Sequence, residues 1–234
     1  MAISVETSAW PGILLGYETV VLTLLKTAFG RERLRKTCRD DLTAVRRHFL
    51  IQFILGLAVP LAAVMVLAAS PAEVVAGLGL GFGKATLGLI LVAAAVPVAY
   101  LAGIIGAADP EMRAFYPFSK KALSDRKAFF GYEVGYFLFY YTSWEFIFRG
   151  VFFFPVAVSL GLVPALAVST AASTLFHIGH PDTEIYAALG AGFIFGLIAW
   201  WTGTFLYLIP IHAFIGIATD TRIFRLVSRE RSRI

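Results

Sequence analysis

The chain has 234 residues, of which 59% are hydrophobic and only 15% are charged, with a net charge of +5. An ordinary soluble domain carries about 25% charged residues, so this composition excludes a typical soluble globular protein. The charges are also clustered, and they leave apolar stretches of about 20 residues, long enough to cross the hydrocarbon core of a bilayer. The sequence therefore predicts an integral membrane protein.

The apolar stretches lack the two-residue alternation of a membrane β-barrel, whose strands face lipid and lumen in turn. Because a spanning backbone must satisfy its own hydrogen bonds, helices remain. We predict an all-α fold, a polytopic transmembrane helical bundle that forms one domain over residues 1–234. About seven membrane segments (six to eight) are expected. They lie at residues 10–29, 49–69, 85–106, 129–160, 162–179, 184–202 and 204–221.

The segment 129–160 is too long for one straight span, and we expect a break near Gly150 or Pro155. In an unbroken helix, Glu145 would lie ~24 Å from the start of the segment, at 1.5 Å per residue. His180 would lie nearer the other end of its own segment. A broken or tilted 129–160 element is needed to bring these two side chains together.

Basic residues gather in the loops 31–47 and 107–127 and in the tail after residue 221. The positive-inside rule places such segments in the cytoplasm. Two predicted segments separate the two loops and four separate the second loop from the tail, so all three can face one side. We expect a protein of the bacterial cytoplasmic (inner) membrane with cytoplasmic basic loops and C-terminus. The topology accounts for the positive charge, and no nucleic-acid partner is expected.

Three apolar segments carry ionisable residues within hydrophobic sequence: Glu145 and Arg149, then His177 and His180, then His212. Such residues are costly inside a bilayer and mark functional sites by default. The first pair is four residues apart and the second three, so the members of each pair share a helix face. A carboxylate and three histidines on separate apolar segments indicate hydrolysis inside a membrane.

Each of these features also has a structural interpretation. Glu145 and Arg149 could form an ion pair that only fixes helix packing. His180 lies at a helix end, where a histidine interacts favourably with the helix dipole. Asp182 and Glu184 are expected to be the N-cap and first-turn acids of the next helix.

Taken together, the motifs resemble the CPBP intramembrane protease family, also called the Abi or CAAX-protease-like family, which includes the type II CAAX prenyl endopeptidases. That family carries Glu-Glu-x-x-x-Arg, Phe-x-x-x-His and His-x-x-x-Asn on successive transmembrane helices. The corresponding runs here are Trp144-Glu145-Phe-Ile-Phe-Arg149, Phe176-His177-Ile-Gly-His180 and His212-Ala-Phe-Ile-Gly216. The resemblance covers about residues 125–221, the expected catalytic core.

Two positions depart from the family pattern. Trp144 stands where the family has its first Glu, usually assigned as the general base, and Gly216 stands where it has Asn. Either the chain is inactive, or it belongs to a branch in which Glu145 alone does the work. We favour the second hypothesis, for which the run His-x-Gly-x-Pro-x-x-Glu that begins at His177 is a further feature. The motif histidine is then His177 or His180.

The resemblance implies an intramembrane endopeptidase whose partners are the bilayer and a membrane-associated protein or peptide substrate. Glu145 would take a proton from water, and Arg149 would hold Glu145 in place. His212, with His177 or His180, would orient the water and stabilise the oxyanion. No cofactor is expected. The alternative is zinc held by His177, His180 and His212 with an open position, although the chain has no His-Glu-x-x-His motif.

Two other classes of function remain open. Trp144 and Gly216 favour a catalytically inactive membrane scaffold or a bacteriocin self-immunity protein. A small transporter with a buried proton relay is the third hypothesis, because membrane Glu and His residues also serve as relays. A transporter predicts inverted repeats or Gly/Pro-broken helices in matching halves, and the sequence has neither.

Overall fold

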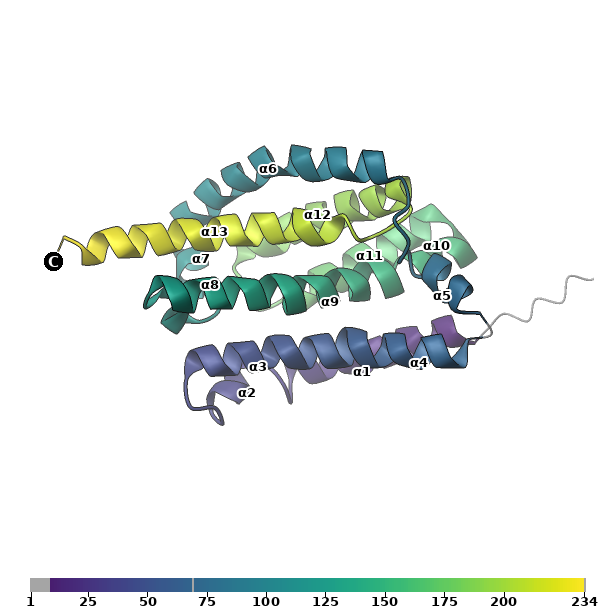
Figure 1. Cartoon of the computed structure of the whole chain (residues 1–234), viewed down its shortest axis with the longest axis horizontal. Coiled ribbons are helices and arrows are strands. Elements are labelled where there is room, and N and C mark those ends of the chain that lie inside the picture. The colour runs from purple at the N-terminus through teal and green to yellow at the C-terminus, as the bar shows by residue number, and fades with distance from the viewer. Residues whose placement is uncertain (1–8, 69, 234) are drawn as a thin grey trace, which may run out of the picture.

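The computed structural model describes residues 9–68 and 70–233, and within these ranges the chain forms helices and no β-strand. The longer helices run along the long axis of the molecule as one bundle (Figure 1). Four helices are long and apolar enough to cross a membrane: Asp41–Leu67, Ala85–Ala108, Arg126–Leu160 and Asp182–Thr202. The predicted all-α transmembrane bundle is confirmed.

Every predicted segment corresponds to a helix or a run of helices. In chain order these are α1 (Trp10–Lys26), α3 (Asp41–Phe53) continuing into α4 (Val59–Leu67), α6 (Ala85–Ala108), α8 (Arg126–Gly135) to α10 (Phe154–Leu160), α11 (Leu162–Phe176), α12 (Asp182–Thr202) and α13 (Leu208–Arg231). Short helices connect them: α2 (Arg31–Arg35), α5 (Pro71–Gly77) and α7 (Pro110–Phe115). The last helix continues ten residues past its predicted end, because the basic tail contains no Gly or Pro to stop it.

The long element Arg126–Leu160 is broken where the sequence predicted. After α8 come a π-helical stretch (Tyr136–Tyr141), α9 (Thr142–Glu145) and a second π-helical stretch (Phe146–Val151). A turn at residues 152–153 then separates this run from α10. Pro155 lies in the first turn of α10, where its missing N–H removes no helical hydrogen bond. Glu145 is thus the last α-helical residue before a π-helical stretch, a geometry often found at functional sites.

The short helix α11 explains how distant parts of the sequence meet. Its 15 residues span about 22 Å at 1.5 Å per residue, less than the ~30 Å of a bilayer core. The loop 177–181 therefore begins inside the bundle. There the ring of His177 lies 4.9 Å from the ring of Trp144, between ring centroids.

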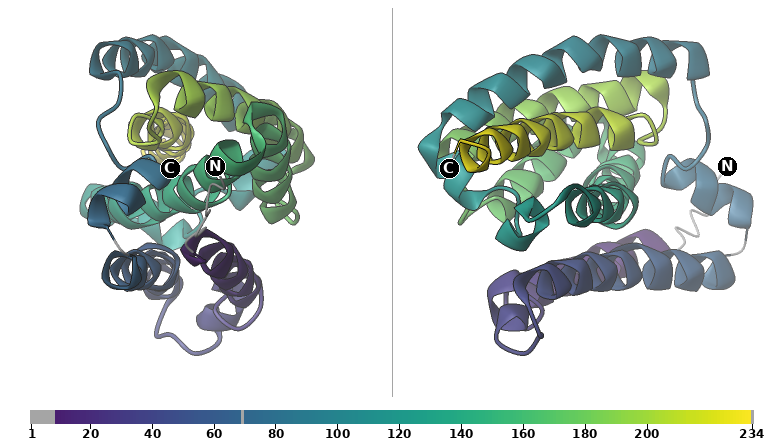
Figure 2. Two further views of the ribbon diagram at one scale, coloured as in Figure 1. Left: turned by 90° about the vertical axis from the view of Figure 1, so that its right-hand side faces the viewer. Right: turned by 60° about the vertical axis from the view of Figure 1, so that its left-hand side comes forward.

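The helix that carries Glu145 lies at the centre of the bundle. In Figure 1, α1, α3 and α4 lie on one side of α8 and α9, and α13 and α6 lie on the other; Figure 2 shows the same separation from two further sides. The most apolar window of Arg126–Leu160 is 78% buried, against 17% for Ala85–Ala108, so the first is enclosed by protein and the second is a peripheral helix.

The three basic segments gather at one end of the bundle. Helices α2 and α7 and the C-terminal end of α13 all lie at the left of Figure 1. Arg35 donates to the carbonyl oxygen of Phe118 at 2.6 Å, and Arg231 donates to that of Leu123 at 2.7 Å. The three basic segments thus share one end of the bundle.

Candidate functional site

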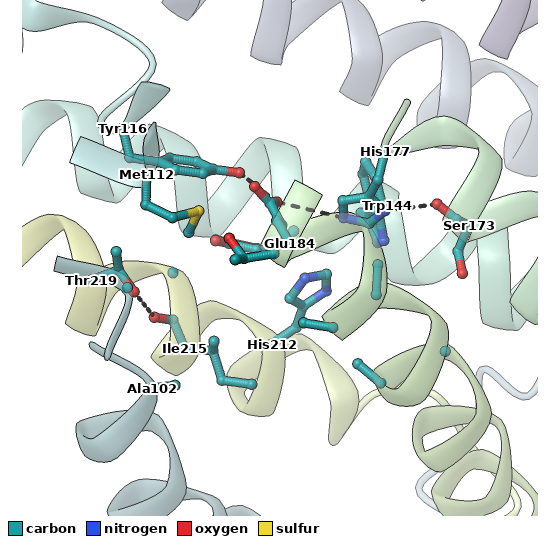
Figure 3. A pocket seen from close by; sticks show the side chains of 18 of the residues that line it. Ala102, Met112, Tyr116, Trp144, Ser173, His177, Glu184, His212, Ile215 and Thr219 are labelled. Atoms are coloured by element: carbon teal, nitrogen blue, oxygen red, sulfur yellow. Dashed lines mark hydrogen bonds and ion pairs between the residues drawn. The ribbon is translucent and has the colours of Figure 1, made fainter. Parts of the chain in front are cut away.

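A cavity of about 410 Å³ lies between α6, α7, α12, α13 and the helix of Glu145 (Figure 3). Most of its wall is apolar. Three of the five predicted site residues line it: Arg149, His177 and His212. Glu145 and His180 lie directly behind this wall, each in contact with a side chain that lines it. The fold thus brings the predicted residues of three segments to one cavity.

The first polar cluster is a carboxylate–histidine pair. Glu145 is fully buried, and its Oε1 lies 2.5 Å from Nδ1 of His212. Because an ionised carboxylate only accepts hydrogen bonds, the proton lies on Nδ1 and the other ring nitrogen, Nε2, is left for a different partner. Figure 3 shows the imidazole of His212 directed from α13 toward the region between Glu184 and His177. Such a partner sets the orientation and tautomer of a histidine.

Arg149 completes this cluster on the same helix face as Glu145, as the four-residue spacing predicts. Its Nη1 lies 3.4 Å from Oε2 of Glu145, and the side chain is 2% exposed. The guanidinium also lies 5.2 Å from the ring of Phe195, a favourable cation–π distance. Nε and Nη1 have no hydrogen-bond partner among the described residues. Arg149 therefore presents buried N–H donors at the cavity wall.

The second polar cluster lies at the α11–α12 loop. His177 donates from Nδ1 to the carbonyl oxygen of Ser173 at 2.7 Å, and its Nε2 lies 3.7 Å from Oε1 of Glu184. The same oxygen accepts hydrogen bonds from Nδ1 of His180 at 3.0 Å and from the Tyr116 hydroxyl at 2.6 Å. Burial raises the pKa of Tyr116 well above its usual value, and the nearby Glu184 adds to this, so the hydroxyl stays protonated.

Glu184 is the site residue that the sequence analysis missed. It lies in the first turn of α12, as expected, but its carboxylate contacts two histidines and lines the cavity. Pro181 is the N-cap of this helix, and Asp182, predicted as the cap, is its first residue. The spacing of four residues from His180 to Glu184 is the signal that could have found the contact, because it places both side chains on one side.

The second cluster could also hold a metal ion. His177, His180 and Glu184 each offer one ligand atom, and these atoms lie within 4.8 Å of one another. Two histidines and one carboxylate form a typical catalytic zinc set. The zinc set predicted from the sequence contained His212 instead. Among the described residues His212 is not part of this group, because its Nδ1 faces Glu145.

Trp144 occupies the position beside His177 where the family pattern has a carboxylate. Its indole is 1% exposed and packs against Phe148 and Phe176, with ring centroids 4.8 and 5.5 Å away. The indole Nε1 has no hydrogen-bond partner among the described residues. The ring therefore gives this part of the site an apolar surface in place of a carboxylate.

The contact with Tyr141 explains why position 216 holds a glycine. A Cβ atom added there would lie 1.7 Å from the hydroxyl oxygen of Tyr141. The ring of Tyr141 lines the cavity, 4.8 Å from that of His212 between centroids. The Tyr141 hydroxyl thus takes the space that a longer side chain at position 216, such as the Asn of the family motif, would need.

Residues 130–218 match the model of a protein family described as type II CAAX prenyl endopeptidase Rce1-like. The match supports membership of the CAAX protease-like family for this part of the chain. The match lies within the predicted core 125–221 and includes the five predicted site residues, Glu145, Arg149, His177, His180 and His212. Neither a curated protein nor a solved structure matches the chain. The same match supports a CAAX-type intramembrane protease function in general terms.

Proposed function

We propose that the protein is an intramembrane endopeptidase that hydrolyses peptide bonds of membrane-associated proteins or peptides. The observation that carries this proposal is the contact between Glu145 and His212 at the wall of a cavity inside a helical bundle. A buried carboxylate that orients a histidine beside a cavity is a recurrent arrangement in hydrolytic sites. The match to the CAAX protease-like family covers both residues.

In the proposed reaction, a carboxylate of the cavity other than Glu145 activates a water, which attacks the scissile carbonyl. His212 faces the oxyanion that develops. When Nε2 of His212 carries a proton, that N–H faces the oxyanion, and the carboxylate of Glu145 beside Nδ1 balances the charge of the ring. The Nε–H of Arg149, which has no hydrogen-bond partner among the described residues, adds a donor on the same wall. Preorganised donors of this kind stabilise an oxyanion in a site that excludes bulk water.

Glu145 has a positioning role in this proposal. The sequence assigned it as the base that takes a proton from water. Its two oxygens, however, face His212 and Arg149, and the side chain is fully buried. It therefore acts through His212, and no cofactor is part of the proposed reaction.

The cavity has room for a substrate backbone next to α6 and α12. These two helices contribute mainly small side chains to its wall: Ala102, Gly106, Ala187, Ala188, Ala191 and Gly192. Small residues let a peptide approach closely while the surrounding helices exclude lipid.

The basic end of the bundle is proposed to face the cytoplasm of a bacterial cell, in its cytoplasmic membrane. Cys38, the single cysteine of the chain, lies in the loop between α2 and α3 at this end and is partly exposed. We expect a membrane-impermeant maleimide to label it in inverted membrane vesicles and not in intact spheroplasts. A Cys38→Ser variant controls for background. Labelling in spheroplasts alone would reverse the topology.

The proposed function predicts an uncleaved substrate in cells that carry His212→Ala. The membrane proteomes of these cells and of wild-type cells should differ in at least one protein that accumulates at full length. Tyr186→Phe is a suitable control because Tyr186 is 75% exposed on α12. Identical proteomes at equal expression of both proteins would contradict the protease function and favour a scaffold.

A further inference from the structure

Resting on the proposed peptidase function, we propose that Glu184, together with His177, holds and deprotonates the water that attacks the substrate. This assigns the catalytic carboxylate to a residue of α12, outside the motif in which Trp144 replaces the expected Glu. Three features of the cavity support the assignment: the choice of acids on its wall, the hydrogen bonds left open, and the position of the opposite wall.

The acids that line the cavity in the described part of the chain are Asp109 and Glu184. Both oxygens of Asp109 are engaged: Oδ1 accepts from the backbone N–H of Glu111 at 2.8 Å, and Oδ2 accepts from the Thr183 hydroxyl at 2.9 Å. Asp109 thus serves as a helix cap for α7. Oε2 of Glu184 is buried and has no hydrogen-bond partner among the described residues. Of the two acids that line the cavity, Glu184 is therefore the one with a carboxylate oxygen that accepts no hydrogen bond from the described residues.

A histidine beside this carboxylate also needs a hydrogen-bond donor. Because the carbonyl of Ser173 can only accept, Nδ1 of His177 carries the proton, and Nε2 of the neutral ring is an acceptor. Nε2 lies 3.7 Å from Oε1 of Glu184, so this ring nitrogen and the carboxylate, both acceptors, lie side by side without a proton between them. One water that donates to Nε2 and to Oε2 satisfies both groups. The lone pairs of its oxygen are then available for attack.

The other oxygen of Glu184 holds the carboxylate in place. Oε1 accepts hydrogen bonds from Tyr116, which follows α7, and from His180, which lies in the loop between α11 and α12. These two bonds restrict rotation of the carboxylate. His180 therefore has a positioning role, and His177 is the histidine that contacts the water.

The two clusters form opposite walls of one cavity. Figure 3 shows Glu184 and His177 on one side, and the ring of His212 opposite them. If a substrate carbonyl lies between the two walls, the water held by Glu184 attacks its carbon from one side. The carbonyl oxygen then points toward His212 and Arg149 on the other side. Negative charge beside the water and positive charge beside the oxyanion match the charge that develops during attack.

The reaction balances with these groups alone. As the water oxygen bonds to the carbonyl carbon, Oε2 of Glu184 takes its proton and the π electrons move to the carbonyl oxygen beside His212. When the carbonyl re-forms, the C–N bond breaks, and Glu184 returns the proton to the leaving nitrogen. The products are an acid and an amine, and Glu184 is again a carboxylate. One carboxyl group acts as base and then as acid.

The test uses the purified full-length protein in detergent and, as substrate, the membrane fraction of cells that carry His212→Ala. New C-termini are counted by the ¹⁸O that they take up from labelled water. We expect Glu184→Gln to lower the rate at least about 100-fold, the lower range of general base catalysis. Glu184→Asp keeps a carboxylate and should regain part of the rate. Asp182→Asn, which changes a nearby acid of the same helix, should leave the rate unchanged.

Several outcomes would overturn the inference. If Glu184→Gln stayed within fivefold of wild type while His212→Ala was inactive, Glu184 would not be the base although the protein was a peptidase. Bound zinc at one ion per chain, with activity lost on chelation, would assign the water to a metal ion. If Glu184→Gln melted early, His177→Gln would replace it in the same assay, with the same loss expected. If wild type formed no labelled C-termini, the proposed function itself would fail.

Discussion

Glu145→Gln is expected to lower the turnover number by about 10²–10³-fold, the range lost when a group that stabilises the oxyanion is removed, because Glu145 holds His212 in place. The carboxylate accepts from Nδ1 of His212 at 2.5 Å, and a neutral amide would hold the ring less firmly and place no negative charge beside it. The same change leaves the guanidinium of Arg149 without its counter-charge in a site that is 2% exposed. Breaking a buried pair in this way costs roughly 3–5 kcal/mol.

The measurement combines cleavage kinetics with thermal unfolding of the purified protein in detergent. The turnover number should fall, and the melting temperature should fall with it. Glu111→Gln is the control, because Glu111 is an exposed acid of α7 and should affect neither quantity. Full proteolysis by a correctly folded Glu145→Gln protein would show that the carboxylate is not needed.

Trp144→Ala should destabilise the protein strongly. The indole is 1% exposed and lies within 5.5 Å of the rings of Phe148, Phe176 and His177, between centroids. Removal of a buried Trp side chain costs about 3–5 kcal/mol, because the surrounding residues cannot fill the void. The void would also let His177 move and reduce cleavage.

Thermal unfolding of the same detergent-solubilised protein measures this effect. Trp200→Ala is the matched control, because Trp200 is 45% exposed on α12 and should lower the melting temperature much less. Trp144→Phe keeps most of the packing and should lie between wild type and Trp144→Ala. Equal losses at positions 144 and 200 would show that Trp144 is not a packing centre.

The membrane setting, the all-α class and the approximate segments could be predicted because each depends on local composition. Apolar runs of suitable length are helices in a bilayer whatever their neighbours are. The break in 129–160 was predicted from Gly150 and Pro155 for the same local reason. The end of α13 was not predicted. A basic tail can be helical or non-helical with little difference in local free energy.

The residue types of the site were also visible in the sequence, since ionisable groups stand out in apolar surroundings. Their partners were not. The i,i+4 spacing correctly put Glu145 and Arg149 on one face. No local pattern could show that His212, 67 residues further along the chain, lies against Glu145.

Glu184 shows most clearly where the local argument ends. Its place in the first turn of α12 explains an acid there by the helix dipole alone. Its contacts with Tyr116 and His177 depend on how the loop after α7 and the short helix α11 pack together. By itself, the sequence determined a helical membrane protein with a polar site from residues of the CAAX-protease-like motifs. Only the tertiary structure decided which acid reaches the cavity, because side chains far apart in the chain meet through packing and not through spacing.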